Sequence, residues 1–330
     1  MITREQLKNL CEDELKAFLI SGDYYRDIEL TKAVMQEIEN REAEKIGREP
    51  YKLIFEDLGQ GGYGYCDSNE KVISINVRFL MEKLKGMWPG ANALNTILHE
   101  GRHAWQYYML DHRRNELAPE AAEAMDIERY AYISPDNPAS IVDIGWRDQV
   151  FFEYASQEME MDARHYALIN MERLAEQHPE NVQLQKHLES ARSEEVEVVV
   201  QVMEHISDRQ LQKLLRLRME RLRKIYGAGF RTDHPFRNIE MICRVIKPAY
   251  HTLLRNGTVR ISDRYSLVYV LYLQSRDATE RGIPLAKPED LLRIFYASLE
   301  YKRDFRLEKP ETEEVEKPEK LEKKKTTIKM

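Results

Sequence analysis

The spacing of hydrophobic residues along the chain predicts a mostly helical protein with two short strands. Apolar residues recur every three or four positions over most of the sequence, as they do on one face of an α-helix. Two runs rich in β-branched and aromatic residues, 51–57 and 71–76, predict strands. We expect these strands to pair as a hairpin through the glycine-rich stretch between them. Helices are predicted at two places within 3–46 and at 77–85, 92–110, 148–177, 181–206, 209–225, 231–256, 263–275 and 288–301.

This pattern indicates an α+β fold that is mostly helical, with a small antiparallel sheet packed on one helix. Residues 1–50 are expected to form helices that pack on a core of residues 51–178. Residues 179–306 form an all-helical C-terminal region in this interpretation. Residues 307–330 are rich in Glu and Lys and poor in apolar residues, which predicts a disordered tail.

The helices at 181–206 and 209–225 carry opposite charge. The first is acidic and the second is basic, with an apolar stripe of leucines along the second. This contrast predicts an antiparallel pair of helices with matched charges. The alternative is that the basic helix binds nucleic acid, but a neighbouring acidic helix would cancel its field.

Composition limits the class of protein further. The chain has 330 residues, a net charge of −7 and 42% hydrophobic residues, which fits a globular protein rather than a dedicated nucleic-acid binder. No apolar run is long enough to span a membrane, and the N-terminus lacks the apolar segment of a signal peptide. The three cysteines, Cys11, Cys66 and Cys243, are few and far apart, which favours free thiols and a cytoplasmic location.

The predicted helix at 92–110 contains the sequence His-Glu-x-x-His, which is the signature of zinc hydrolases. A four-residue spacing places His99 and His103 on one face, one turn apart, where both imidazoles can bind one metal ion. Glu100 lies beside them and can take a proton from a water activated by the metal. Apolar residues surround the motif, and Gly101 inside a helix suggests that another group approaches closely there.

A catalytic zinc ion usually takes three protein ligands, and two glutamates on the predicted helix 148–177 compete to be the third. Glu158 and Glu160 lie about 200° apart around a helix axis, so they cannot share a face. Glu158 falls on the apolar side and Glu160 among polar residues. Because a buried charge needs a partner, we assign Glu158 as the ligand and Glu160 to solvent. Asp162, one turn after Glu158, is expected to accept a hydrogen bond from His99 or His103.

The pattern His99-Glu100-x-x-His103 followed by Glu158-x-x-x-Asp162 resembles the gluzincin metallopeptidases, and in particular the small intracellular peptidases of the ImmA/IrrE type. The strand at 72–76 and the run from Glu158 to Ala167 add to the resemblance, which covers roughly residues 50–175. It implies a zincin-like core in which an edge strand holds the substrate by backbone pairing. The spacing between His103 and Glu158 is longer than in compact members, and the insert at 112–147 is expected to pack over the cleft.

The resemblance implies a cytoplasmic zinc endopeptidase that acts on a protein or peptide. Glu100 would be the general base, and His165 or Tyr154 could stabilise the oxyanion. Histidine and carboxylate ligands suit Zn²⁺ but also other divalent ions. Two other functions stay open: a regulatory or binding protein on a peptidase-like fold in which zinc is structural or absent, and a nucleic-acid accessory protein that acts through 209–225.

Overall fold

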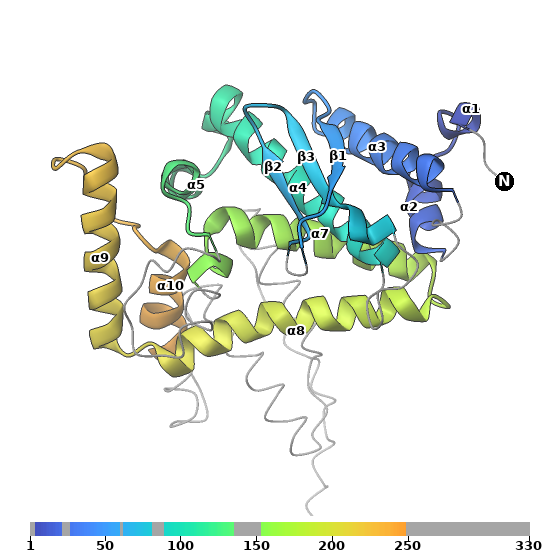
Figure 1. The fold of residues 1–330 in the computed structure, drawn as a ribbon. Coiled ribbons are helices and arrows are strands. Elements are labelled where there is room, and N and C mark those ends of the chain that lie inside the picture. The colour runs from blue at the N-terminus through green and yellow to red at the C-terminus, as the bar shows by residue number, and fades with distance from the viewer. Residues whose placement is uncertain (1–3, 22–26, 60–61, 81–88, 135–152, 249–330) are drawn as a thin grey trace, which may run out of the picture.

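A computed structural model describes residues 4–21, 27–59, 62–80, 89–134 and 153–248 (Figure 1). Over these residues the chain is mostly helical and has one three-stranded mixed sheet, so the α+β prediction is confirmed at that level. None of the helices in these ranges combines the length and apolarity needed to cross a membrane.

The helices and strands follow one another in a simple order along the chain. The N-terminal region contains α1 (Arg4–Leu7), α2 (Glu12–Ile20) and α3 (Ile28–Lys45). The sheet and the next helices are β1 (Lys52–Glu56), β2 (Gly64–Asp67), β3 (Val72–Asn76), the 3₁₀-helix η2 (Val77–Leu80), α4 (Pro89–His112), the 3₁₀-helix η3 (Arg114–Glu116) and α5 (Pro119–Ala131). Later elements are α7 (Glu158–Gln177), α8 (Val182–His205), α9 (Asp208–Tyr226), α10 (Arg237–Met241) and the π-helical turn η4 (Ile242–Ile246).

The sheet differs from the predicted hairpin in its topology. β1 and β3 are parallel neighbours, and β2 pairs with β3 in the antiparallel direction, so the strand order is β1-β3-β2. The prediction placed all the glycines in a turn and missed β2, which begins at Gly64. The tight turn lies after β2 instead: the Asp67 carboxylate accepts hydrogen bonds from Asn69 and Glu70, and Lys71 adopts a φ of 52°. The prediction of an entirely antiparallel sheet is therefore wrong.

Helix α4 lies at the centre of the fold and contacts β2, β3 and helices α2, α3, α5, α7 and α8. Its apolar side chains share one core with α2, α3, the sheet, α7 and α8, and the fully buried members include Leu15, Ile38, Ile73, Ile75, Leu94 and Ile97. Figure 1 shows α7 passing beneath α4, and α8 passing beneath α7. The N-terminal helices thus belong to the same core as the sheet.

A buried ion pair lies against the middle of α4. Glu39 and Arg48 form two hydrogen bonds of 2.7 and 2.9 Å, and their side chains are 0% and 1% exposed. Arg48 also donates to the carbonyl oxygen of Gly101 at 3.3 Å. A Cβ atom at Gly101 would lie 3.2 Å from Oε2 of Glu39. The close approach expected from a glycine within this helix is therefore confirmed.

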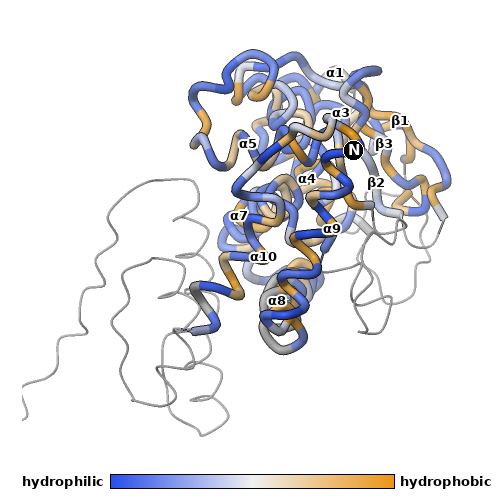
Figure 2. The backbone as a smooth tube through the Cα atoms, turned by 90° about the vertical axis from the view of Figure 1, so that its left-hand side faces the viewer, coloured by the Kyte–Doolittle hydropathy of each residue, from blue (hydrophilic) through white to orange (hydrophobic). Residues whose placement is uncertain are grey.

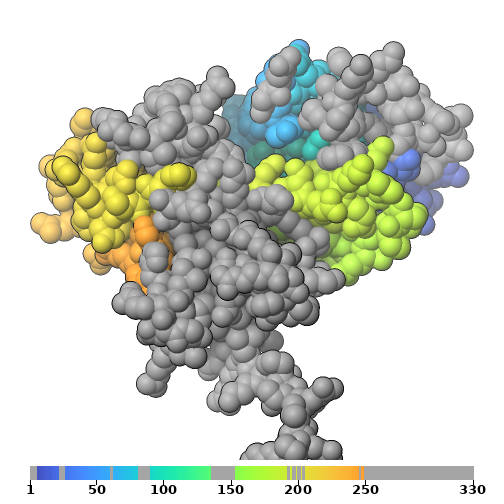
Figure 3. Space-filling view, turned by 90° about the horizontal axis from the view of Figure 1, so that it is seen from below, coloured from blue at the N-terminus to red at the C-terminus, as the bar shows by residue number. Residues whose placement is uncertain are grey.

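The C-terminal helices do not form the predicted antiparallel pair. In Figure 1, α8 runs along the bottom of the molecule, whereas α9 turns away from it and rises at one end. Figure 3 shows the yellow and orange surface of α9 and α10 at that end, away from the lime-coloured surface of α7 and the start of α8. Arg218 of α9 instead donates to the carbonyl oxygen of Ala131, at the end of α5, at 2.6 Å. Opposite charge alone was thus a poor guide to how these helices pack.

Several predicted elements differ in their bounds or lie outside the described residues. Helix α4 begins at Pro89, where proline is well suited to a first helical position, and ends at His112. The helix predicted at 148–177 is broken at Ser156–Gln157, so α7 begins at Glu158. The helices predicted at 263–275 and 288–301 and the charged tail lie outside the described residues. So do parts of the helices predicted at 77–85 and 231–256 and of the 112–147 insert. All three cysteines are free thiols.

Candidate metal centre

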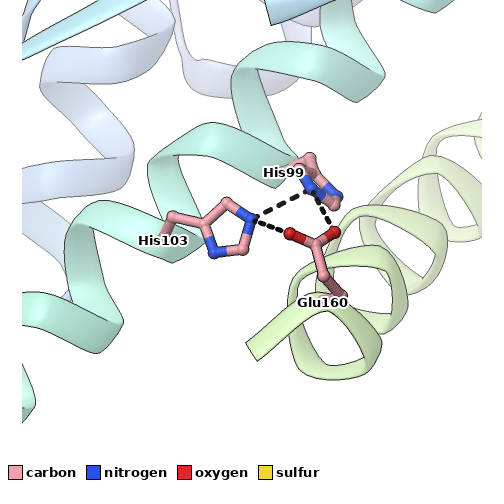
Figure 4. A group of neighbouring side chains, drawn as sticks. All are labelled: His99, His103 and Glu160. Carbon is pink, nitrogen blue, oxygen red and sulfur yellow. Dashed lines mark hydrogen bonds and ion pairs between the residues drawn. The ribbon is translucent and has the colours of Figure 1, made fainter. Parts of the chain in front are cut away.

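Helix α4 carries the His-Glu-x-x-His motif and presents it toward α7. His99 and His103 lie one turn apart, and their Nε2 atoms are 3.1 Å from each other (Figure 4). The side chains of both histidines are largely buried, at 13% and 10% exposed. Two ring nitrogens at this distance require either a shared proton or a bound cation between them, because two lone pairs repel.

The third donor is Glu160, and not Glu158. The Glu160 carboxylate lies 3.4 Å from Nε2 of His99 and 3.3 Å from Nε2 of His103. These three side chains form the one group in the described part of the chain whose ligand atoms could hold a metal ion. Glu158 points elsewhere, and its Oε2 lies 2.7 Å from Nη1 of Arg237. The assignment of Glu158 as ligand and of Glu160 to solvent is therefore reversed.

The reason for the error is that α7 is buried on more than one side. The polar neighbours that made the Glu160 side look solvated are themselves buried: Glu153 is 0%, Gln157 3% and Glu160 1% exposed. The Gln157 amide exchanges hydrogen bonds with the backbone of Ile133 inside the protein. In the sequence, the buried polar face of α7 thus looks the same as a polar face exposed to solvent.

The donor groups lie close enough together to share one metal ion. The two Nε2 atoms are 3.1 Å apart, near the separation of about 3.3 Å that tetrahedral zinc with bonds of about 2.0–2.1 Å imposes. Each histidine faces its own oxygen of Glu160, His103 facing Oε1 at 3.3 Å and His99 facing Oε2 at 3.4 Å. One ligand atom from each of the three residues can be chosen so that all lie within 4.8 Å of one another. Oε2 of Glu160 is fully buried and makes no hydrogen bond to any described residue. A buried carboxylate oxygen without a donor is costly, and a cation would satisfy it. Two imidazoles and one carboxylate could therefore hold a divalent ion such as Zn²⁺.

Gln106 fixes the orientation and the tautomer of His103. Its Nε2 donates to the carbonyl oxygen of Met159 at 2.9 Å and to the Asp162 carboxylate at 2.7 Å. Because both of those partners only accept, the opposite end of the amide must be its oxygen, which lies 2.7 Å from Nδ1 of His103. Nδ1 therefore carries a proton, and Nε2 is the nitrogen that would bind a metal.

Asp162 was expected to accept a hydrogen bond from His99 or His103. It accepts one from Gln106 instead, and so supports His103 indirectly. Its two oxygens also accept hydrogen bonds from Arg102 at 2.8 and 2.9 Å. The guanidinium of Arg102 lies over the ring of Trp105, 3.6 Å from its centroid, and over that of Tyr166, 4.9 Å from its centroid. Sequence reasoning missed Gln106, although it lies three residues after His103 and so on the same face of α4.

Two tyrosines also contact the Glu160 carboxylate. The Tyr132 hydroxyl, just after α5, donates to Oε1 at 2.6 Å. Tyr154 also hydrogen bonds to Glu160, and the rings of Tyr132 and Tyr154 meet edge to face at 6.1 Å. Tyr154, one of the two proposed oxyanion donors, therefore lies at the site, and Tyr132 is a further residue that the sequence did not reveal.

His165, the other proposed oxyanion donor, is not one of the three residues of the cluster. It is 2% exposed, and the charged groups that affect it are Asp162 and Arg102. Burial lowers the pKa of His165 to about 3, opposed by the negative charge of Asp162. At neutral pH it is therefore an uncharged, buried histidine near Asp162 and Arg102, and its role as an oxyanion donor stays a prediction.

The charges of the cluster stabilise one another. Burial alone would raise the pKa of Glu160, but His103 and His99 lower it well below its usual value. Burial would lower the pKa of His103, yet Glu160 and Glu100 raise it to about 9. Burial raises the pKa of Glu100, which brings it closer to the range of a useful general base. In the absence of a cation, the site therefore favours a proton on His103 that a metal would have to displace.

Comparison with known proteins assigns no family to this chain, since no family model, curated protein or solved structure matches it.

We expect Glu160→Gln to abolish retention of zinc, because the amide removes the negative charge that the ion requires. At saturating zinc, Glu158→Gln should keep the wild-type stoichiometry. Elemental analysis after reconstitution and removal of loose metal would measure both. The opposite pattern, with zinc lost in Glu158→Gln alone, would restore the assignment made from the sequence.

We expect Gln106→Leu to raise the dissociation constant for zinc by about 10- to 100-fold, since groups that orient a metal-binding histidine contribute this much to affinity. Competition with a chromophoric chelator would measure the constant. Gln36→Leu is the matched control, because Gln36 bridges backbone groups of Tyr51 and Leu53 away from the histidines. Equal affinities in the two variants would contradict the role of Gln106.

Proposed function

We propose that this protein is a zinc-dependent endopeptidase with His99, His103 and Glu160 as metal ligands. The observation that carries the proposal is the convergence of three buried donor groups, with 3.1 Å between the two Nε2 atoms and a Glu160 oxygen 3.3–3.4 Å from each of them, and with Glu100 next to these groups. Three protein ligands leave a fourth position open, as catalytic zinc sites require. The resemblance to gluzincins and a zincin-like core belong to this proposal, now with Glu160 as the glutamate ligand.

The roles of the side chains follow from their positions. A bound zinc ion would act as a Lewis acid that polarises a peptide carbonyl and lowers the pKa of its bound water to near 7. Glu100 takes the proton of the attacking water and passes it to the leaving amine. Gln106 and Asp162 hold His103 in its ligand tautomer. The hydroxyl groups of Tyr132 and Tyr154 bond to Glu160 in this structure, so either would have to turn from the carboxylate to donate to a developing oxyanion.

Strand β2 is the candidate substrate-binding edge. The central strand β3 is paired on both sides, so neither strand of the predicted hairpin offers a free edge next to α4. β2 is an edge strand and lies against the active helix, where a Cβ atom at Gly64 would be 2.5 Å from the Thr96 side chain and 3.4 Å from that of Glu100. An extended peptide that pairs with β2 would therefore pass close to the general base.

We expect Glu100→Gln to bind zinc as the wild type does and to lower peptide hydrolysis by at least about 100-fold, since general-base catalysis contributes that much or more. A library of quenched fluorogenic peptides would measure activity, with zinc content determined on the same samples. Glu172→Gln, a buried glutamate further along α7, is the matched control. Wild-type turnover in Glu100→Gln would refute the mechanism.

A second candidate function, binding of single-stranded nucleic acid, is favoured by one feature of α9. This helix carries seven Arg and Lys residues against two acidic ones, and it does not lie along the acidic helix that was expected to neutralise it. Figure 2 shows hydrophilic and hydrophobic residues alternating along α9. At its end the rings of Tyr226 and Phe230 stack at 4.6 Å, and Tyr130, 60% exposed, meets Tyr226 edge to face. Basic and aromatic groups together suit a phosphate backbone and unpaired bases.

We expect Arg223→Glu with Lys224→Glu to abolish salt-dependent binding of a single-stranded oligonucleotide, because the variant removes two phosphate contacts and adds repulsion. Fluorescence anisotropy at two salt concentrations would measure the affinity. Lys8→Glu with Lys52→Glu reverses the same charge at exposed positions elsewhere and serves as the control. Failure of the wild type to bind, or equal loss in the control, would exclude this function.

A further inference from the structure

The candidate ligand Glu160 is the third residue of α7, so its position depends on how the first turn of that helix is held. The four first N–H groups of a helix have no partner within the helix. In α7, the residue before the helix is Gln157, whose side chain makes no capping hydrogen bond. The start of α7 must therefore be fixed by groups from other elements.

Glu128 of α5 provides part of this support. Its Oε1 accepts a hydrogen bond from the backbone N–H of Glu158 at 2.8 Å, and its Oε2 accepts one from Met159 at 2.8 Å. A carboxylate at this place also interacts favourably with the positive end of the helix dipole. Glu128 thus performs the capping that Gln157 does not.

Two consecutive residues of α10 hold the same turn from another direction. Nη1 of Arg237 lies 2.7 Å from Oε2 of Glu158, in a pair whose side chains are 24% and 9% exposed. Nδ2 of Asn238 donates to the carbonyl oxygen of Ser156 at 2.8 Å, and Asn238 is 4% exposed. These contacts join α10 to both sides of the residue that precedes α7.

We infer that Arg237 and Asn238 of α10 are positioning residues of the metal centre, which they serve by clamping the first turn of α7 and so placing Glu160 opposite the two histidines. The inference rests on the proposed function and extends it to the C-terminal region. That region carries no metal ligand in its described part, yet it contacts the helix that supplies one. The Glu158 carboxylate then has a role of its own, as the point where the clamp attaches.

This arrangement explains why a buried glutamate occurs two residues before the ligand. Glu158 and Glu160 lie on different sides of α7, and each meets a cationic or hydrogen-bond-donating partner on its own side. A ligand displaced by about 1 Å loses much of its effect, so such sites depend on the groups that support them. Rotation or fraying of the first turn would move the Glu160 carboxylate away from His99 and His103.

The test measures zinc affinity and hydrogen exchange in Arg237→Met, Asn238→Ala and the wild type. We expect each variant to raise the dissociation constant for zinc by about 10- to 100-fold. Amide exchange, read by mass spectrometry on zinc-free protein, should become faster in the peptide that covers residues 156–165. Arg237→Lys keeps the positive charge opposite Glu158 and should recover part of the affinity.

Leu53→Ala is the control for a general loss of stability, because Leu53 is buried in β1, at the edge of the sheet away from β2. It should lower the unfolding temperature without a local change at 156–165 or in zinc affinity. If Arg237→Met and Asn238→Ala bind zinc as tightly as Leu53→Ala does, the clamp is refuted while the metal centre stands. If the wild type binds no zinc, the proposed function is refuted and the positioning role falls with it.

Discussion

The burial of the Glu160 carboxylate is the constraint on which the centre of this protein depends. A carboxylate in the interior costs several kcal/mol unless charged or hydrogen-bonding partners surround it. Its partners here are His99 and His103 from α4 and the Tyr132 hydroxyl from the end of α5. These elements must therefore meet at one point for the charge to be tolerated, which ties the packing of α4, α5 and α7 to the geometry of the site.

The interface between α4 and α7 continues as a polar layer beside this point. Arg102 pairs with Asp162, Asp162 accepts from Gln106, and Gln106 accepts from His103. Because each group satisfies the next, no member can rotate without leaving a buried polar atom unpaired. The orientation of His103 on α4 is in this way set by an aspartate on α7, and the two helices cannot slide past each other without disrupting the cluster of His99, His103 and Glu160.

How much could be predicted from the sequence depended on how local each feature is. His99, Glu100 and His103 could be placed together because four residues make one helical turn. Glu160 could not be placed with them, because a helical wheel distinguishes polar from apolar faces. It does not distinguish a solvent-exposed polar face from a buried one. The parallel pairing of β1 and β3 required knowledge of β2, whose first residue is a glycine and looked like part of a turn. The packing of α9 depends on tertiary contacts such as that of Arg218, which charge patterns do not encode.

The two glycines near the motif show how the backbone accommodates this crowded centre. Gly64 of β2 and Gly101 of α4 both lie where a larger residue would meet a neighbour. A Cβ atom on Gly64 would be 2.6 Å from the backbone oxygen of Ser74, and one on Gly101 would be 3.2 Å from Oε2 of Glu39. The first contact involves rigid backbone and the second a charged pair that is itself buried, so neither neighbour can move freely. Along a single turn, α4 therefore meets the edge strand near Glu100, the Glu39–Arg48 pair at Gly101 and α7 at the histidines. The absence of side chains at two positions allows the remaining side chains to converge.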